Sequence, residues 1–440
     1  MHNELFKKKA LKWAQSQSPC SFLNSCDFGP KQHAAGFGNF DYMLAAGAEH
    51  ELKAHENAFE KLQEFYRVHS DGKQKPWIFG YFGYDLKNQT EQLESKKPDG
   101  IQFPELHFFI PQVVIAVKEN IARVYVHENR TDLSEEMVLN EINNVKLDDA
   151  DNGKASSSQI ELQHKITREL YCDTVEKIKQ HIFLGNVYEM NYCFELFAEN
   201  ADLNVANTYD KITKNSPAPF SCFYSVDDKY LLSASMERFL AKRDKGIFSQ
   251  PIKGTAPRNA DRVIDDEQKK TLQESVKERA ENIMIVDLVR NDLSKIAERG
   301  SVRVDELCKI YSYSHVHQMI STISCILKEE LNWVDAIKAC FPMGSMTGAP
   351  KIAAMKYIEE FESTKRGLYS GAVGYVDPFG NFDFNVVIRS LQYNAANNYL
   401  SLMVGSAITA KSDVEFEYEE CLIKANALQQ ILKTKQKEKV

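Results

Sequence analysis

The sequence predicts an α+β protein with antiparallel sheets. Strand-like and helix-like segments do not alternate as βαβ units along the chain, which argues against a parallel α/β fold. Hydrophobic residues make up 43% and charged residues 26% of the 440 residues, the proportions of an ordinary globular protein. At roughly 150 residues per domain, this length predicts two or three domains, or one large intergrown unit.

The first third of the chain contains short β-like runs and one helical pattern. The runs are rich in aromatic and β-branched residues and predict three strands, at 77–84, 106–117 and 121–127, with a hairpin between the last two. A helix-period stretch covers 49–68. The polar segment 146–158, KLDDADNGKASSS, predicts a surface loop or linker. It separates an N-terminal region, 1–150, from a second region, 160–433.

Periodicity, capping residues and turns predict the elements of the second region. Helices are expected at 167–184, 266–298, 350–362 and 415–435, with Thr347 as the N-cap of the third. Strands are expected at 187–197, 220–226, 230–235, 369–377, 381–393 and 399–405. The sequence Asp-Pro-Phe-Gly at 377–380 predicts a hairpin turn between two of these strands.

Charge and cysteine content exclude several classes of protein. The 54 basic and 62 acidic residues give a net charge of −8, which argues against nucleic-acid binding, and the one basic run, at 433–439, is typical of a solvated tail. The nine cysteines are scattered and form no CxxC, as expected for free thiols in a reducing compartment. No apolar run is long enough for a membrane span or a signal peptide. We therefore expect a cytoplasmic protein that binds neither nucleic acid nor membrane.

Two pairs of glutamates stand at helical spacing in the second region. Glu278 and Glu281 are three residues apart in one predicted helix, and Glu417 and Glu420 are three residues apart in another. Each pair shares a helix face. Two such helices side by side bring four carboxylates together, an arrangement that requires a hard cation such as Mg²⁺. The alternative is that both pairs are ordinary solvated charges.

Three further charged residues stand in unusual contexts. Arg389 interrupts the apolar run NVVIRSLQY, where its guanidinium needs an anion, either a protein carboxylate or a substrate carboxylate. Lys253 lies in the constrained loop QPIKGTAPR, and a desolvated lysine there can act as a nucleophile. Glu237 ends a β-like run and is a candidate general acid. Simple surface roles remain open for Lys253 and Glu237.

Two small-residue segments are candidate anion sites. The segment 344–351, GSMTGAPK, leads into a predicted helix, whose free N–H groups favour an anion. The segment 405–409, GSAIT, reads as a turn whose backbone amides can hold a carboxylate. Taken together, these features predict a site for a small dianionic substrate and a divalent cation.

The chain closely resembles the chorismate-utilising enzymes, and within them the aminodeoxychorismate synthase component I group. The motifs that carry this resemblance are SMERFL (235–240), PIKGTAPR (251–258), ERAENIMIVDLVRNDL (278–293), HVHQMISTI (315–323), FPMGSMTGAPK (341–351), YSGAVGY (369–375), VIRSL (387–391) and EYEECLIKANAL (417–428). They follow the order of the family. The resemblance implies an intergrown two-part fold of large antiparallel sheets packed face to face and flanked by helices. It also implies that 160–433 is the catalytic, chorismate-binding part.

The same resemblance implies how the substrate is held. Glu278, Glu281, Glu417 and Glu420 would surround Mg²⁺, which grips the ring carboxylate of chorismate, with Lys424 as a second partner. The enolpyruvyl carboxylate would be held by a set of contacts that comprises Arg389, Tyr369, Ser345 and the amides of Gly405, Ser406 and Ala407. Thr255, in the lysine motif, is expected to contact the substrate.

Lys253 decides the subgroup, since anthranilate synthases resemble PIAGT at this motif and the aminodeoxychorismate enzymes resemble PIKGT. In the implied mechanism neutral Lys253 attacks ring carbon C2, and Glu237 protonates the departing C4 hydroxyl. Ammonia then adds at C4 and expels the lysine. The pKa of free lysine is about 10.4, so burial or the nearby Mg²⁺ must favour the neutral amine.

The chain also departs from the family pattern. Glu189 stands where amination enzymes usually have Gln, and Gln318 stands where many relatives have a histidine, with His317 one place earlier. Met236, Ala407 and Lys411 replace a proline, a glycine and an acidic residue. No amidotransferase segment is visible, so ammonia is expected from a separate glutaminase subunit, component II, or from free ammonium. The alternatives are an anthranilate synthase component I, or a catalytically lapsed partner that binds chorismate or tryptophan.

Overall fold

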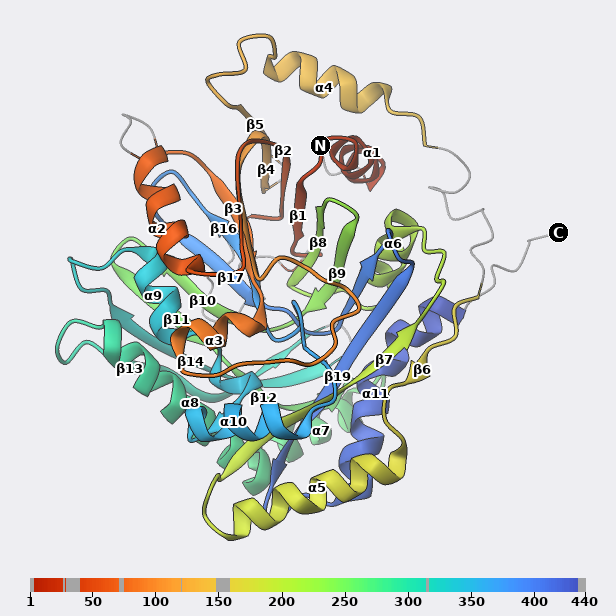
Figure 1. Ribbon diagram of the computed structural model, residues 1–440, viewed down its shortest axis with the longest axis vertical. Helices are drawn as coiled ribbons and strands as arrows, with labels where there is room; N and C mark the ends of the chain where they lie inside the picture. The colour runs from red at the N-terminus through yellow and green to blue at the C-terminus, as the bar shows by residue number, and fades with distance from the viewer. Residues whose placement is uncertain are drawn as a thin grey trace.

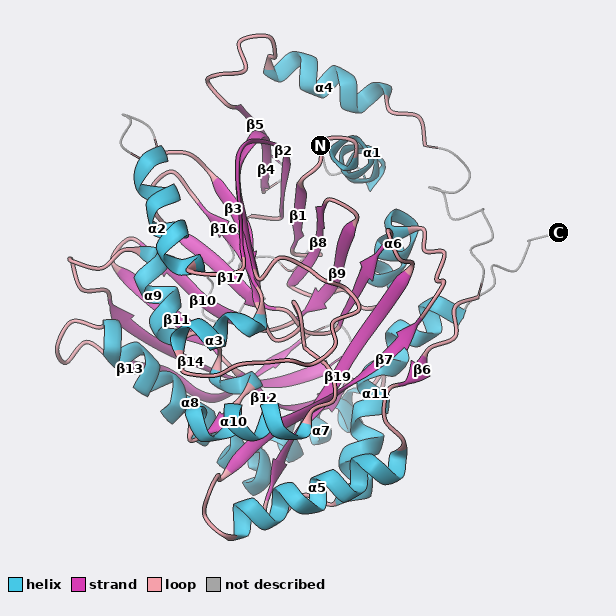
Figure 2. Cartoon of the chain, in the orientation of Figure 1, coloured by secondary structure: helices cyan, strands magenta, loops and turns pink. Residues whose placement is uncertain are grey.

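The computed structural model describes residues 4–26, 28, 40–70, 75–119, 121–147, 159–313 and 316–433. Nineteen strands within these ranges join one continuous antiparallel sheet, which folds over so that its two halves face each other (Figure 1). Helices cover the outer face of each half (Figure 2). The α+β prediction is therefore confirmed. Most of the predicted linker (148–158), His315 of the HVH motif and the end of the basic tail (434–439) lie outside the described residues.

The first half of the sheet contains the longest strand pairs. Its order from one edge is β6 (Gln163–His164), β7 (Glu189–Ala198), β19 (Tyr399–Thr409), β18 (Ser390–Asn394), β9 (Lys229–Ser235), β8 (Phe220–Val226), β1 (Cys20–Asn24), β2 (Tyr42–Ala54), β4 (Leu106–Lys118) and β5 (Ile121–Val126). The two-residue strand β15 (Gly348–Ala349) pairs with the start of β7. The pairing of β7 with β19 extends from Ala198↔Leu400 to Glu189↔Thr409.

The second half begins where β4 changes partner. Residues 106–109 of β4 pair with β3, and residues 113–118 pair with β5, so β4 belongs to both halves. From β3 (Ile78–Phe82) the order continues through β16 (Ala372–Val376), β17 (Phe382–Val386), β10 (Arg238–Arg243), β11 (Gly246–Gln250) and β14 (Val316–Ile326), which also pairs with β12 (Ile252–Pro257) and β13 (Arg303–Ser312).

The two halves bury a common aromatic core. The rings of Tyr81 on β3 and Tyr224 on β8 lie 5.2 Å apart edge to face, although four strand pairings separate these strands within the sheet. Strands of the N-terminal region also pair with strands of the second region, β1 with β8 and β3 with β16. The fold is therefore intergrown, as the family resemblance implies, and the division near residue 150 stays a prediction.

The helices form two outer layers. The first half is covered by α1 (Glu4–Gln15), α4 (Glu135–Asn144), α5 (Arg168–Phe183), α6 (Val205–Asn215), α10 (Lys351–Phe361) and α11 (Val414–Lys433). The second half is covered by α2 (Ala58–His69), α8 (Val276–Ile296) and α9 (Trp333–Cys340), with α7 (Arg262–Glu274) beside β12 and β13. Three short helical turns are α3 (Lys87–Thr90), η2 (Tyr84–Leu86) and η3 (Gly344–Met346). None of the helices in the described ranges is long and apolar enough to cross a membrane.

Three predicted helix features are wrong in detail. The helical pattern at 49–68 covers the end of β2 as well as α2, because the polar residues of β2 imitate a helix face. The long helix at 266–298 is two helices, since Ser275 leaves the helical conformation and its hydroxyl caps α8 by accepting the N–H of Glu278. Thr347 does not cap α10, because its hydroxyl donates to the carbonyl of Met343 and Pro350 takes the cap position.

A buried ion pair fastens several of these elements together. Arg366, between α10 and β16, donates from Nε to Glu362 at 2.9 Å, and both side chains are almost wholly buried. The guanidinium also donates to the carbonyls of Met346 in η3 and Asn191 in β7. Glu362 in turn accepts the backbone N–H of Cys193. One ion pair thus fixes η3, β7 and the end of α10 against each other.

We predict that Arg366→Met lowers the free energy of unfolding by about 3–5 kcal/mol, because it leaves the Glu362 carboxylate buried without its cation. Urea denaturation followed by fluorescence measures the change. Arg290→Met is the control, since Arg290 pairs with Asp287 at the surface with both side chains more than half exposed, and it should change stability by no more than about 0.5 kcal/mol. A loss no greater than that of the control would contradict this role of Arg366.

Candidate active site

One cavity of about 690 Å³ collects nearly all of the site residues expected from the sequence. It lies among β7, β12, β19, η3, α8 and α11, and its lining includes Glu237, Lys253, Thr255, Glu278, Glu281, Ser345, Tyr369, Arg389, Gly405, Ala407, Glu417, Glu420 and Lys424. Ser406 is the exception. Its hydroxyl points to the other side of β19, 3.2 Å from the hydroxyl of Tyr171. Segments more than 200 residues apart in the chain thus meet at one site.

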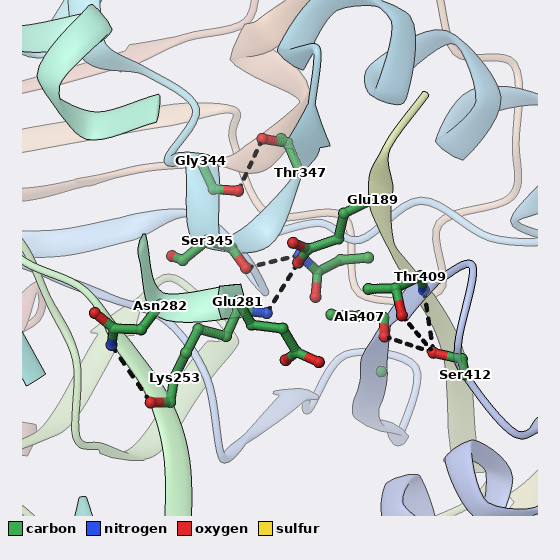
Figure 3. Close-up of polar contacts among 12 residues, drawn as sticks. Glu189, Lys253, Glu281, Asn282, Gly344, Ser345, Thr347, Ala407, Thr409 and Ser412 are labelled. Carbon is green, nitrogen blue, oxygen red and sulfur yellow. Dashed lines mark hydrogen bonds and ion pairs between the residues drawn. The ribbon is translucent and has the colours of Figure 1, made fainter. Parts of the chain in front are cut away.

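Lys253 reaches into this cavity from β12 and meets an unexpected partner. Its Nζ donates to Oε1 of Glu189 at 3.1 Å, and the Glu189 side chain is fully buried (Figure 3). Burial lowers the pKa of Lys253, but the carboxylates of Glu189, Glu281 and Glu237 outweigh this effect and raise the pKa above its usual value. The lysine is therefore held as an ammonium, whereas the expected mechanism needs the neutral amine.

Glu237 lies in the same cavity with the properties of an acid. It follows β9 and is 6% exposed. Burial raises its pKa to about 7, although Ser345 and Lys253 act in the opposite direction. A carboxyl group with this pKa is protonated in a large fraction of molecules at neutral pH and can donate its proton. The structure thus keeps Glu237 in the form that a general acid requires.

The four glutamates line the wall formed by α8 and α11. Glu278 and Glu281 come from α8, and Glu417 and Glu420 come from α11. Burial raises the pKa of Glu281 to about 7, and the neighbouring carboxylates of Glu278 and Glu189 add to this rise. Within the described ranges no three acidic, histidine or cysteine side chains are close enough to hold a metal ion. The oxygen donors therefore share one wall without converging on a point.

Arg389 also lines the cavity, near enough to Tyr369 and Glu420 for both to act on the pKa of its guanidinium. The expected strand 381–393 is interrupted here, because residues 387–389 separate β17 from β18 and Arg389 adopts a left-handed backbone with φ 49°. Its guanidinium forms no ion pair or hydrogen bond with any residue that the structure describes. A protein carboxylate is thus not its partner in this structure, and the side chain is available to an anion from outside.

The segment 405–409 is part of β19 and not a turn, which corrects the sequence prediction. β19 pairs with β18 only as far as Leu402, so one edge of the strand beyond this point faces the cavity. Lys424, which also lies 2.6 Å from Glu420, donates to the carbonyl of Gly405 at this edge. Since the N–H and C=O of a strand residue point the same way, the amides of Gly405 and Ala407 face this edge too. A side chain at position 405 would collide with the Cys193 sulfur, 2.4 Å from an added Cβ.

The structure also shows where two side chains point whose roles the sequence leaves open. His317 points away from the cavity, with Nε2 3.1 Å from Asp265 and Nδ1 2.8 Å from the hydroxyl of Ser312. Gln318, its neighbour on β14, lines the cavity because successive strand residues face opposite sides. Among the described residues, its Oε1 is buried without a hydrogen-bond partner and can contact a ligand. The hydroxyl of Ser345 lies beside the Glu237 carboxyl in the same lining.

Comparison with known proteins identifies relatives along most of the chain. A family model described as chorismate binding enzyme matches residues 18–430. Aminodeoxychorismate synthase component 1 of Klebsiella aerogenes is 33% identical over 79% of this chain and 75% of its own length. Anthranilate synthase component 1 of Aquifex aeolicus is 30% identical over 84% of this chain and 77% of its own. The crystal structure of anthranilate synthase component I from Streptococcus pneumoniae TIGR4 shares the fold, with a TM-score of 0.76 at 24% identity over 88% of this chain and 91% of that one.

We predict that Glu237→Gln stabilises the protein in a pH-dependent way. The carboxyl pKa rises from 4.5 to about 7 on folding, so the wild type loses about 3 kcal/mol of stability as the pH rises through this range and Glu237 ionises in its buried place. The amide does not ionise. The variant should therefore match the wild type near pH 4 and exceed it by about 3 kcal/mol near pH 9. Urea denaturation at both pH values tests this, with the exposed Glu267→Gln as control; an equal difference at both pH values would refute the burial of this charge.

Proposed function

The chain belongs to the family of chorismate-binding enzymes, and we propose that within this family it aminates chorismate at ring carbon C4 to give 4-amino-4-deoxychorismate. The observation that carries this proposal is the position of Lys253 in the cavity, with the acid Glu237 in the same lining. Relatives named for both aminodeoxychorismate and anthranilate formation have similar identity to this chain, so overall similarity does not choose between them. Lysine in the PIKGT motif favours the first.

The shape and charge of the cavity suit a small dianion. Its volume of about 690 Å³ lies within the usual range for small-molecule sites. Arg389 offers a fork of donors to one carboxylate of chorismate, the enolpyruvyl one, and Tyr369, Gly405 and Ala407 belong to the same lining. The second carboxylate, on the ring, is assigned to the wall of α8 and α11. The hydroxyl of Ser345, in the same lining, supplies one more polar contact.

The glutamates of that wall suit Mg²⁺ by their chemistry. Glu278, Glu281, Glu417 and Glu420 offer only oxygen donors, which Mg²⁺ prefers, and their mutual repulsion favours a cation between them. When bound, Mg²⁺ supplies the positive charge that attracts the ring carboxylate and offsets the surrounding glutamates. Lys424 lies beside Glu420 and is assigned as a second partner of this carboxylate.

The proposed reaction uses Lys253 as a nucleophile and Glu237 as an acid. The neutral amine forms a bond to C2, the two ring double bonds each move by one position, and the C4–oxygen bond breaks. Glu237 gives its proton to the departing oxygen, which leaves as water. Ammonia then forms a bond to C4, the double bonds return and the bond from C2 to Lys253 breaks. The enolpyruvyl ether is untouched throughout.

The proposed reaction requires one reaction that supplies its ammonia and another that consumes its product. 4-Amino-4-deoxychorismate retains its pyruvyl ether, so a separate lyase must remove pyruvate to give para-aminobenzoate for folate synthesis. Ammonia is proposed to come from a separate glutaminase subunit, component II, in the cytoplasm. The second candidate function is formation of anthranilate and pyruvate, which the anthranilate synthase relatives favour.

We predict that Lys253→Ala abolishes amination and retains chorismate binding. Wild-type protein with chorismate, Mg²⁺ and ammonium should form 4-amino-4-deoxychorismate, which mass spectrometry identifies and an added lyase converts to para-aminobenzoate. The variant should lose at least about 10³-fold in rate because no other group can form the covalent intermediate. Its dissociation constant for chorismate, measured by calorimetry, should change by less than about tenfold, since Arg389 and the glutamates remain.

Two results would contradict this assignment. Anthranilate and pyruvate formed by the wild type without a lyase would make the protein an anthranilate synthase. Wild-type amination by Lys253→Ala would exclude the covalent mechanism. If the wild type binds chorismate but converts none of it even with a glutaminase subunit present, the protein is a catalytically lapsed binder.

We predict that Glu281→Gln and Glu420→Gln each weaken Mg²⁺ binding by about 10–100-fold, because each removes an anionic ligand from the wall of α8 and α11. Isothermal titration with Mg²⁺, in the presence and absence of chorismate, measures the effect directly. Glu419→Gln is the matched control, since Glu419 lies on the same helix and faces Arg168 at 3.3 Å on the surface. Unchanged Mg²⁺ affinity in both cavity variants would refute the metal assignment.

A further inference from the structure

We propose that Glu189 is the catalytic base that takes the proton from Lys253 and so produces the neutral amine. This inference rests on the proposed nucleophilic role of Lys253. It addresses the conflict at the site: the mechanism needs a neutral lysine, and the surrounding carboxylates favour an ammonium.

Glu189 is placed for this role by the backbone. It is the first residue of β7, where its backbone lies between Thr409 of β19 and Ala349 of β15. Its side chain is fully buried and Oε1 accepts the hydrogen bond from Nζ of Lys253 at 3.1 Å (Figure 3). Lys253, 14% exposed, opens onto the cavity from the other side. The carboxylate therefore touches the reacting nitrogen from behind and leaves its front to the substrate.

The second oxygen of Glu189 supports the proposal independently. Oε2 is buried and makes no hydrogen bond with any atom of the described residues. A buried carboxylate with one oxygen unsatisfied is costly to keep ionised, and an ion pair with a single hydrogen bond compensates it poorly. Transfer of the proton along the existing hydrogen bond removes both charges and keeps the contact between the two side chains. The neutral pair is the form from which Nζ can attack the substrate.

The other charges near Lys253 do not replace Glu189. Glu281 of α8 and Glu237 after β9 act on the ammonium through space, and Lys277 lies 4.0 Å from Glu281. Neither forms a hydrogen bond with Nζ. Gln318 on the neighbouring strand β14 is uncharged. Glu189 is thus the one carboxylate, among the described residues, in direct contact with the nitrogen that must lose a proton.

The proton balance closes over the cycle. Nζ gives one proton to Glu189, and its free electron pair forms the bond to C2 while Glu237 gives its proton to the C4 oxygen. When ammonia has bonded to C4, the bond between C2 and Nζ breaks and its electrons return to the lysine. The new C4 ammonium gives a proton to Glu237, and Glu189 returns its proton to Lys253. The net change is chorismate and ammonia to aminodeoxychorismate and water.

The test measures the covalent step alone. Without ammonia, protein with chorismate and Mg²⁺ should gain the mass of chorismate minus water on Lys253, and intact-protein mass spectrometry follows the rate. At pH 7 we expect Glu189→Gln to slow this step by about 10²-fold, because the amide keeps the hydrogen bond but accepts no proton. The ratio of wild-type to variant rates should fall about tenfold per pH unit towards alkaline pH, since the variant's lysine must release its proton to water. Ionisation of Glu237 affects both proteins alike and cancels in this ratio.

Two further variants make the result specific. Glu195→Gln is the matched control, because Glu195 is a buried glutamate on the same strand that accepts a hydrogen bond from Tyr399, and its adduct rate should equal that of the wild type. Glu189→Asp keeps a carboxylate and should show a reduced rate with the pH dependence of the wild type. These variants separate loss of the base from loss of strand packing.

The outcomes distinguish this inference from the proposed function. A wild-type rate and pH profile in Glu189→Gln would refute the base, as would a faster rate, which would mean that Glu189 only restrains Lys253. Product formation by the wild type without any adduct would instead remove the nucleophilic role of Lys253, and with it the need for this base.

Discussion

The buried ion pair of Arg366 and Glu362 is the constraint on which the cavity depends. It joins η3, β7 and the end of α10 through four backbone and side-chain contacts. These same elements carry Ser345, Glu189 and Asn191, whose amide also holds the carbonyl of Ser345. A buried pair gains little over apolar packing in general, but its directional hydrogen bonds fix one arrangement of the backbone. The positions of these site residues are therefore fixed by an ion pair that lies outside the lining of the cavity.

The lining of the cavity carries more acidic than basic side chains. Glu237, Glu278, Glu281, Glu417 and Glu420 line it, against the cations Lys253, Lys277, Arg389 and Lys424. The structure relieves the excess in two ways, by raising the pKa of Glu237 and Glu281 to about 7 and by pairing Lys424 with Glu420. Arg389 has no ion-pair partner among the residues that the structure describes. In the proposed reaction, one carboxylate of the substrate binds Arg389 and the other binds at the glutamate wall, where an added cation would offset the remaining negative charge.

The residues of the cavity could be anticipated from the sequence better than some elements. Arg389 and Glu420 stood out by local context and spacing, but only the family resemblance favoured a substrate or metal role for them. Both line the cavity, and their roles stay predictions. The pairing of Lys253 with Glu189 could not be predicted, because it depends on how the fold brings together two side chains that are 64 residues apart in the chain. The break at Ser275 was hidden because helical charge spacing continues on both sides of it. The strand at 405–409 looked like a turn because only the pairing with β7 keeps small residues extended.

The contact between Glu189 and Lys253 connects the pairing of the strands with the proposed chemistry of the site. A lysine in an acidic cavity is stable as an ammonium, which makes it a poor nucleophile. A base placed on the substrate side would compete with chorismate for space and charge. Glu189 avoids both difficulties because β7 holds it behind the lysine, in a position that the pairing with β19 and β15 fixes. The long antiparallel pairing of β7 with β19 therefore does more than build the sheet. It also fixes the position of the carboxylate that takes the proton of Lys253.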